Sequence, residues 1–197
     1  MSEQLGTGQS NTNGNSKKNL QTSRLNKPWK LSNEGITFIA VWESGIYNGK
    51  NWQKQTVTEG MILTVYDDGR GFPTVGMGHL VVSADNLKLG NTITMERARE
   101  FARKDLSTVE NAINSKVKVP LFQYEYDALV SLLFNTGIYR NKKKNETINR
   151  IDVVANILNK GGYADMPEFI KQFIASVPTR RKSEANLFKN GVYDAKH

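Results

Sequence analysis

Apolar residues recur every three or four positions in several long stretches of the chain, which is the spacing of a helix with one buried face. In the first of these stretches, Ile36, Ile39 and Ala40 follow Ser32, a residue type that commonly caps a helix N-terminus. Gly45 is suited to end this helix in a left-handed conformation. Further periodic stretches predict helices over 95–115, with Thr94 as its N-terminal cap, and over 121–136, 151–159, 167–176 and 178–190.

One short region predicts strands instead. An apolar run over 61–65 leads into a turn of aspartates and glycines over 67–71, and a second short run follows. Two strands joined by such a turn are typical of a β-hairpin. The hairpin would hold the Asp68 carboxylate and the Thr74 hydroxyl on neighbouring strands, beside a backbone that Gly76 leaves open to a large ligand.

Glu43 lies one helical turn beyond Ala40 and continues the apolar stripe of the first predicted helix. A carboxyl on the buried side of a helix C-terminus is desolvated and lies at the negative end of the helix dipole, and both effects favour its protonated form. An acid near a carboxylate and a hydroxyl indicates cleavage of a glycosidic bond. The alternative is an exposed glutamate where the helix frays.

Composition separates the N-terminus from the rest of the chain. Residues 1–30 are rich in Gly, Ser, Asn, Thr, Gln and Lys, which predicts a flexible tail ahead of one domain over 31–197. The first residues lack a basic-then-apolar signal pattern, and no apolar run is long enough for a transmembrane helix. We therefore expect the protein to be made in the cytoplasm and to act on the periplasmic or exposed cell wall.

The chain contains no Cys and two His, one of them terminal, so no disulfide, metal or other cofactor is expected. Its formal net charge of +8 draws it to polyanions such as nucleic acid, anionic lipid or bacterial wall polymers, without choosing among them. The chain also contains a basic run, which is either a solvated loop or a site that attracts such polymers. This run contains Arg140, Lys142, Lys143 and Lys144.

Several motifs follow one another in a fixed order. They are Glu43-Ser44-Gly45, Tyr66-Asp67-Asp68-Gly69, Thr74-Val75-Gly76-Met77-Gly78-His79, Phe134-Asn135-Thr136-Gly137 and the segment from Pro178 to Ala185. In this order they resemble the Glu…Asp…Thr signature and the helices of the phage-type lysozymes, the muramidases of glycoside hydrolase family 24. The resemblance covers about 32–193. It implies an α+β, lysozyme-like fold with a small N-terminal β-hairpin lobe, a larger helical C-terminal lobe and a cleft between them.

The resemblance implies hydrolysis of the β-1,4 bond between N-acetylmuramic acid and N-acetylglucosamine in peptidoglycan. Glu43 would protonate the leaving oxygen, and Asp68 would activate a water that Thr74 helps to hold. Asp68 fits the family spacing better than Asp67, which is expected to face solvent; a calcium loop here would need further ligands. This scheme predicts inversion with carboxyls about 6.5–9.5 Å apart, whereas about 5 Å would favour a retaining route.

Three substrate-binding residues follow from the same resemblance. Asn135 would line the cleft and bind sugar, or would serve only as a polar helix cap. Arg180 would contact Glu43, where its charge would oppose the protonated form. Tyr66 is the third. Phe173 stands where the family commonly has Trp, so the packing there is expected to differ.

Two further expectations concern structure rather than chemistry. His79 is expected to pair with Asp105 on the next helix, in a structural role. The link between Glu43 and Asp68 is longer than in the family, so 46–60 is expected to be an insertion. A surface loop is its simplest interpretation, and a hairpin arm, a lid or a partner-binding surface are the alternatives.

Three functions remain open on the sequence alone. One is a monomeric phage endolysin. The second is a secreted interbacterial toxin of the same chemistry, matched by an immunity or inhibitor protein. The third is a non-catalytic module that holds wall glycan or nucleic acid. The joint presence of Glu43, Asp68 and Thr74 favours an enzyme acting on bacterial peptidoglycan, with no specific nucleic-acid partner.

Overall fold

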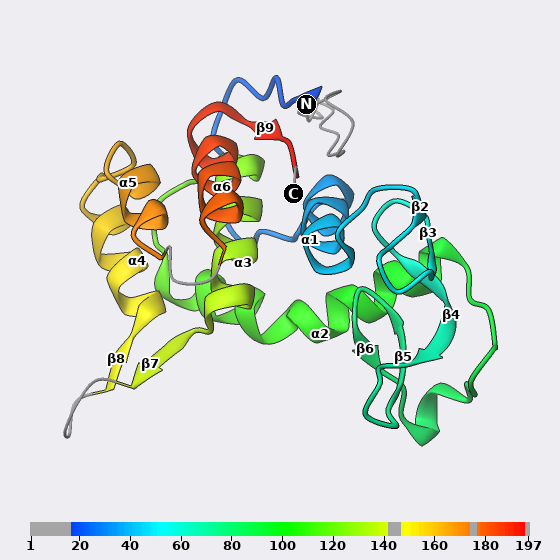
Figure 1. Ribbon diagram of the computed structural model, residues 1–197. Coiled ribbons are helices and arrows are strands. Elements are labelled where there is room, and N and C mark those ends of the chain that lie inside the picture. Colours follow the sequence, from blue (N-terminus) through cyan, green and yellow to red (C-terminus); the bar gives the residue numbers. More distant parts are fainter. Residues whose placement is uncertain (1–16, 142–146, 174–176, 196–197) are drawn as a thin grey trace.

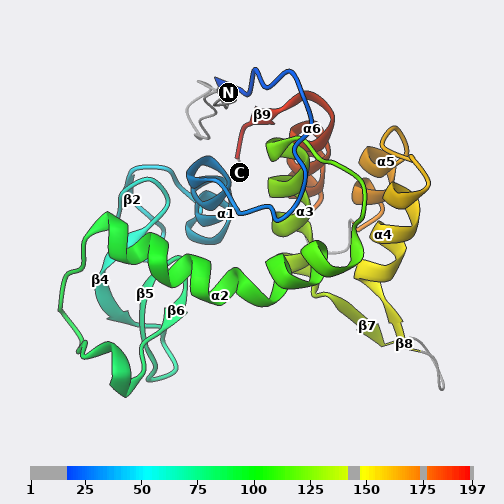
Figure 2. The same cartoon turned by 180° about the vertical axis from the view of Figure 1, so that it is seen from behind.

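The computed structural model describes residues 17–141, 147–173 and 177–195. Helix α2, Met95–Lys116, joins a small β-rich lobe to a larger helical lobe (Figure 1). Seen from behind, α2 crosses the β-rich lobe and continues beneath α1 and α3 (Figure 2). The α+β architecture expected from the sequence is confirmed.

The β-rich lobe is built on a three-stranded antiparallel sheet in the order β4-β5-β6. The strands are β4, Ile62–Asp67, β5, Pro73–Gly76, and β6, His79–Leu80. Tyr66 pairs with Thr74 across the predicted hairpin, which is confirmed. A 3₁₀ helix, Ser83–Asp85, leads from β6 toward α2.

The helical lobe surrounds helix α3, which lies between α1, α2 and α6 (Figure 1). A hairpin of two short strands, β7 and β8, follows α3. The helices are α1, Asn33–Ser44, α3, Gln123–Thr136, α4, Arg150–Asn159, α5, Met166–Lys171, and α6, Pro178–Asn190; the strands are β7, Tyr139–Asn141, and β8, Thr147–Asn149.

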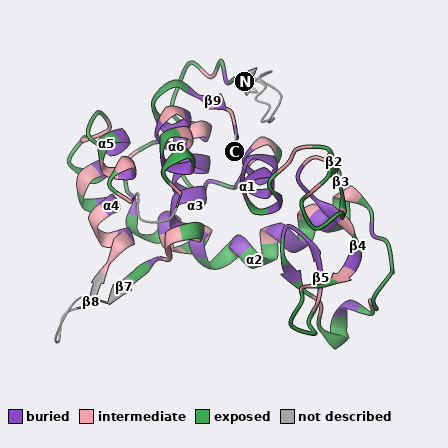
Figure 3. Ribbon diagram, viewed as in Figure 1, coloured by how far each residue is buried: buried purple, intermediate pink, exposed green. Residues whose placement is uncertain are grey.

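Both predicted N-terminal helix caps are present. The Ser32 hydroxyl accepts a 2.9 Å hydrogen bond from the Gly35 N–H, and the Thr94 hydroxyl accepts one of 3.2 Å from the Arg97 N–H. Helix α1 is more enclosed than a single apolar stripe predicts, since every residue from Gly35 to Trp42 is buried. It is a central helix rather than a surface one (Figure 3).

Two helix boundaries differ from the sequence prediction. Helix α3 begins at Gln123 instead of 121, because Leu121 forms an antiparallel bridge with Leu25 and Glu125 accepts a 2.8 Å hydrogen bond from the Phe122 N–H. Helix α5 ends at Lys171, short of the expected 176, and positions 174–176 lie outside the described residues.

The N-terminal segment corrects the expected tail over 1–30. Residues 1–16 lie outside the described part, but 17–30 pack against the helical lobe. Strand β1, Lys17–Lys18, pairs with β9, Val192–Tyr193, and the side chain of Trp29 is buried. A few well-placed apolar and charged side chains hold this segment although its composition is polar.

The segment 46–60 forms a hairpin arm rather than a plain loop. Strands β2, Gly49–Lys50, and β3, Thr56–Val57, pair antiparallel, with Trp52 largely exposed between them. Gly60 ends the arm at φ +81°, where an added Cβ would lie 2.6 Å from the backbone nitrogen of Val41. Only glycine allows the arm to approach α1 so closely.

No helix in the described ranges is long and apolar enough to cross a bilayer. The core runs through both lobes, along the inner faces of the central helices and the sheet (Figure 3). Of the basic run after α3, the side chain of Arg140 and all of 142–144 lie outside the described residues.

Candidate active site

Glu43 lies in the last turn of α1. Gly45 ends that helix at φ +84° and donates its N–H to the Val41 carbonyl at 2.9 Å. The Glu43 side chain is 30% exposed, and its Oε1 accepts a 2.7 Å hydrogen bond from Nη1 of Arg180. The predicted contact between these two residues is confirmed. Burial of the carboxyl is only partial, so a ligand can reach it.

The two adjacent aspartates both cap the turn between β4 and β5. Oδ1 of Asp67 accepts hydrogen bonds from the backbone N–H groups of Gly69 and Gly71, at 2.7 and 3.0 Å. Oδ1 of Asp68 accepts from Arg70 and Phe72, at 2.8 and 3.2 Å. Asp67 is exposed, as expected, whereas Asp68 is half-buried.

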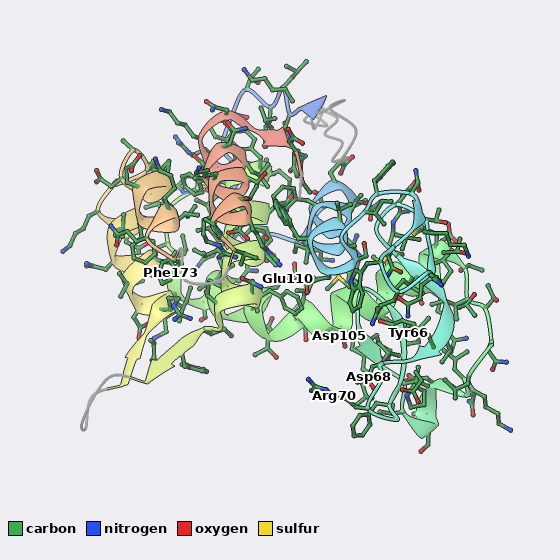
Figure 4. The ribbon with its side chains drawn as sticks, viewed as in Figure 1. Tyr66, Asp68, Arg70, Asp105, Glu110 and Phe173 are labelled. Atoms are coloured by element: carbon green, nitrogen blue, oxygen red, sulfur yellow. The ribbon has the colours of Figure 1, made fainter. Side chains whose placement is uncertain are left out.

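Thr74 begins the return strand of the hairpin. Its side chain is buried, and its hydroxyl donates to the Phe72 carbonyl at 3.1 Å. Because Thr74 lies opposite Tyr66, the hairpin brings the threonine hydroxyl and the tyrosine ring to neighbouring strands. Figure 4 shows Tyr66 and Asp68 together on the β-rich lobe.

A small pocket joins the end of α1 to the hairpin. Burial, with a contribution from the negative charge of Asp68, raises the pKa of Tyr66. Asp68 lies two residues beyond Tyr66, and neither Asp68 nor Thr74 is among the residues that line the pocket. The pocket is lined by Glu43, Ser44, Ile62, Tyr66, Gly76, Met77 and Gly78.

The pocket continues into a larger hollow between the lobes, because Met77 and Gly78 line both. Together the two hollows form a groove from the end of α1, past β6 and α2, to the end of α3. The second hollow is also lined by His79, Leu80, Val82, Lys104, Asp105 and Phe134.

Asn135 follows Phe134 at the groove end of α3 and is exposed. Its side-chain oxygen accepts a 2.6 Å hydrogen bond from Nη2 of Arg181. Asn135 is therefore held by a side chain of α6, rather than serving only as the helix cap that the sequence left open.

Beneath Glu43 and Asn135 lies a buried cluster of charged residues from α6, which packs against α3. Arg180, Arg181 and Glu184 are 0–2% exposed. Burial lowers the pKa of Arg181 and raises that of Glu184, against the attraction between their opposite charges. Ser131 completes the cluster by donating its hydroxyl to Oε1 of Glu184 at 2.6 Å.

His79 makes the predicted pair with Asp105, with Nδ1 3.0 Å from the carboxylate. Its other nitrogen, Nε2, lies 3.2 Å from Oδ2 of Asp85, and its ring stacks on Phe101. Burial opposes ionisation of Asp85, but hydrogen bonds from the Val82 N–H and from His79 hold its pKa low. His79 thus fastens the end of the sheet to α2.

Sequence reasoning missed two of these partners. Asp85 lies in a 3₁₀ helix of three residues, too short to show a periodic pattern, so nothing in the sequence relates it to His79. Glu184 follows Arg180 and Arg181 at spacings of four and three residues, which is the signal for ion pairs along one helix. Such pairs are usually on the surface, and the spacing alone does not show that this cluster is buried.

A groove between a small β lobe and a helical lobe, with an acid at a helix end facing a hairpin, defines a lysozyme-like protein. A model of the phage lysozyme family matches residues 56–184, about two thirds of the chain. The chain belongs to the phage lysozyme family, and the resemblance inferred from its motifs is confirmed. The matched segment includes Asp68, Thr74, Asn135 and Arg180, and Glu43 precedes it.

Individual relatives support this assignment. The endolysin of Salmonella phage P22 is 50% identical over 80 residues, which are 40% of this chain and 55% of that protein. The endolysin of Acyrthosiphon pisum secondary endosymbiont phage 1 is 36% identical over 132 residues, 66% of this chain and 82% of that protein. A crystal structure of a P22 lysozyme mutant superimposes with a TM-score of 0.58 and 31% identity, covering 81% of this chain and 98% of that one.

Proposed function

We propose that the protein is a muramidase that hydrolyses the β-1,4 bond between N-acetylmuramic acid and N-acetylglucosamine in bacterial peptidoglycan, and that it acts as a phage endolysin. The observation that carries this proposal is the pocket in which a partly exposed Glu43, held by a buried arginine, faces the β4–β5 hairpin. The relatives described as endolysins favour this role over a secreted toxin with an immunity protein or a non-catalytic module.

In the proposed reaction, Glu43 is the general acid. Arg180 binds Oε1, so Oε2 is the oxygen that can carry the proton to the leaving glycosidic oxygen. The 30% exposure of this side chain makes it accessible to a sugar strand in the groove. General acid catalysis of this kind contributes about 10²–10⁴-fold to the rate.

Asp68 is the proposed base. Both of its hydrogen bonds to the turn use Oδ1, which leaves Oδ2 to accept a proton from the attacking water. The Thr74 hydroxyl donates to a carbonyl, so its oxygen can accept a hydrogen bond from the same water. Activation of water by a second carboxylate is the inverting route, and we expect the product to have inverted configuration.

Tyr66 and Asn135 are the proposed sugar-binding residues at the two parts of the groove. Tyr66 lines the small pocket beside Glu43, and the exposed Asn135 follows Phe134, which lines the larger hollow. All of the proposed groups come from one chain, so the proposal requires no second copy.

The test is clearing of permeabilised Gram-negative cells by the wild type, Glu43→Gln and Asp68→Asn. We expect each substitution to reduce the rate by about 10²-fold or more, because each removes one proton-transfer group. Asp67→Asn is the matched control, since it alters the neighbouring exposed aspartate of the same turn, and it should retain most of the activity.

Clearing that survives both Glu43→Gln and Asp68→Asn would contradict the mechanism. Mass spectrometry of digested sacculi identifies the bond that is cut. Reducing-end muramic acid supports a muramidase, anhydro ends would indicate a lytic transglycosylase, and cut peptide stems would indicate an amidase or peptidase.

A further inference from the structure

Glu184 is a carboxylate buried within the helical lobe, at the interface of α6 and α3. Its side chain is fully enclosed. Oε1 accepts hydrogen bonds from the Ser131 hydroxyl at 2.6 Å and from Nε of Arg180 at 3.1 Å. Oε2 lies 2.9 Å from Nη1 of Arg181. One buried carboxylate therefore contacts two buried guanidinium groups.

The two arginines diverge from Glu184 toward different parts of the groove. Nη1 of Arg180 donates to Oε1 of Glu43 at 2.7 Å. Nη2 of Arg181 donates to the side-chain oxygen of Asn135 at 2.6 Å. Arg180 thus donates one nitrogen to Glu184 and another to Glu43. Arg181 brings Nη1 within ion-pair distance of Glu184 and donates Nη2 to Asn135.

We propose that Glu184 is a positioning residue that orients both the proton donor, Glu43, through Arg180, and the sugar-binding amide of Asn135, through Arg181. The inference rests on the proposed muramidase function. It extends that function by coupling two parts of the groove through one side chain that touches no substrate.

The physical reason is the combination of charge and planarity. A guanidinium is planar, so fixing one edge also fixes the directions of its remaining N–H groups. Without Glu184, two buried cations would share the single carboxylate of Glu43. The charge left uncompensated favours displacement of the side chains toward solvent. Loss of the Glu184 charge is therefore expected to release both Arg180 and Arg181 from their present orientations.

The first experiment measures kcat and KM of Glu184→Gln on soluble, uncrosslinked peptidoglycan strands, by release of reducing ends. Gln preserves the shape of the side chain and removes its charge. We expect kcat to fall and KM to rise, each by about tenfold, the effect of one misplaced charge-assisted hydrogen bond. Circular dichroism establishes that the variant is folded.

The matched control is Glu125→Gln. Glu125 is also a buried carboxylate on a helix, bound by Nε and Nη2 of Arg24, but it lies away from the groove residues. We expect this variant to lose stability while its kcat and KM stay within about twofold of the wild type. Equal kinetic effects of the two substitutions would overturn the proposal, because they would reduce Glu184 to a general stabilising role.

Coupling between residues separates positioning from stability. In an Asn135→Ala background, Glu184→Gln should no longer raise KM, because the amide that Arg181 orients is absent, but it should still lower kcat. Additive effects on KM would overturn the proposal, since residues that act through one another are non-additive.

Arg181→Lys keeps the test available if Glu184→Gln does not fold. Lysine retains the positive charge beside Glu184 but lacks the planar fork that reaches Asn135 as well. We expect KM to rise about tenfold with kcat nearly unchanged, and an unchanged KM would overturn the proposal. The wild type and Glu43→Gln are assayed in parallel. A wild type without activity would refute the muramidase function itself. An active wild type together with an Arg181→Lys variant of unchanged KM would refute only the role of the cluster.

Discussion

Asp127 joins three separate parts of the chain through one carboxylate. It is fully buried on α3. Oδ2 accepts hydrogen bonds from the hydroxyls of Ser32 and Tyr193, and Oδ1 accepts one of 2.8 Å from Nε2 of Gln123. The Ser32 hydroxyl is also the cap of α1, so Asp127 connects the start of α1, helix α3 and the C-terminal strand β9.

Asp127 gives the stability of the fold a predictable pH dependence. Burial raises the pKa of Asp127 to about 6, against the hydrogen bonds that favour its ionised form. In the unfolded chain the pKa is about 3.9, so between about pH 4 and pH 6 the folded state binds the proton more tightly. The contribution of Asp127 to the free energy of unfolding is therefore complete below about pH 4 and falls by roughly 3 kcal/mol as the pH rises through 6.

Urea unfolding of the wild type and Asp127→Asn at about pH 4.5 and pH 7 measures this contribution. Asn does not titrate. Its side-chain amide places further hydrogen-bond donors beside the existing donors of Ser32, Gln123 and Tyr193, so we expect the variant to be less stable than the wild type at both pH values. We expect the stability difference between the two proteins to be larger at pH 4.5. A difference that grows toward neutral pH would contradict the prediction.

Single residues were predictable where the chemistry is local. Ser32 and Thr94 cap their helices as expected, because a cap depends on neighbours within three residues. The contact of Arg180 with Glu43 came from the family resemblance. Burial of Glu184 and Asp127 was not predictable, because it depends on which helices pack around them, and the sequence of one helix does not contain that information.

At the scale of elements, the N-terminal segment 17–30 packs across the surface of the helical lobe, and we call it the strap. Besides its pairing through β1, it inserts Arg24 between the rings of Phe122 and Tyr163, at 4.7 and 3.8 Å from their centres. The guanidinium also donates to both carboxylate oxygens of Glu125, at 3.0 and 2.7 Å. One arginine thus fixes the segment against the start of α3.

Replacement of Arg24 by Met should destabilise the protein by about 2–3 kcal/mol. The substitution leaves the almost fully buried carboxylate of Glu125 without its cation, and it removes the contacts with the two rings. Urea denaturation measures the change.

Lys116→Met is the control for the Arg24 variant. Lys116 pairs with Asp152 at 3.0 Å, but both side chains are about half exposed, so its loss should change the stability by less than about 0.5 kcal/mol. Similar effects of the two substitutions would show that the segment does not depend on Arg24.

The strap also shows where element prediction fails. Helices and the hairpin were predictable because their apolar residues repeat at a regular period. The strap has no period, and its few anchoring residues are spread through polar sequence. Its structure comes from the surface of α3 that it covers. The hairpin arm over 46–60 is similar, since its short strands are paired and Gly60 is held against α1, and neither contact appears as a pattern in the sequence.

At the scale of the whole molecule, the groove needs both lobes and the helix that joins them. Glu43 comes from α1, Tyr66 and Gly76 from the sheet, and Phe134 from the end of α3. The order of the motifs was enough to predict two lobes with a cleft between them. The separation of the lobes depends on α2 and on its attachment to the sheet through His79 and Asp105. The helix and the attachment were both predicted from the sequence, whereas the separation that they set was not.

The net charge of the chain leads to a prediction about its action on whole cell walls. A protein with a formal charge of +8 is attracted to an anionic wall at long range, in addition to its contacts within the groove. The Debye length falls from about 30 Å at 0.01 M salt to about 8 Å at 0.15 M, so this attraction is screened over the same range. We expect the clearing of permeabilised cells to slow several-fold between these salt concentrations, whereas hydrolysis of short wall fragments without net charge changes little. Equal salt effects on the charged wall and the neutral substrate would place the effect in the groove chemistry, and would show that net charge does not drive binding to the wall.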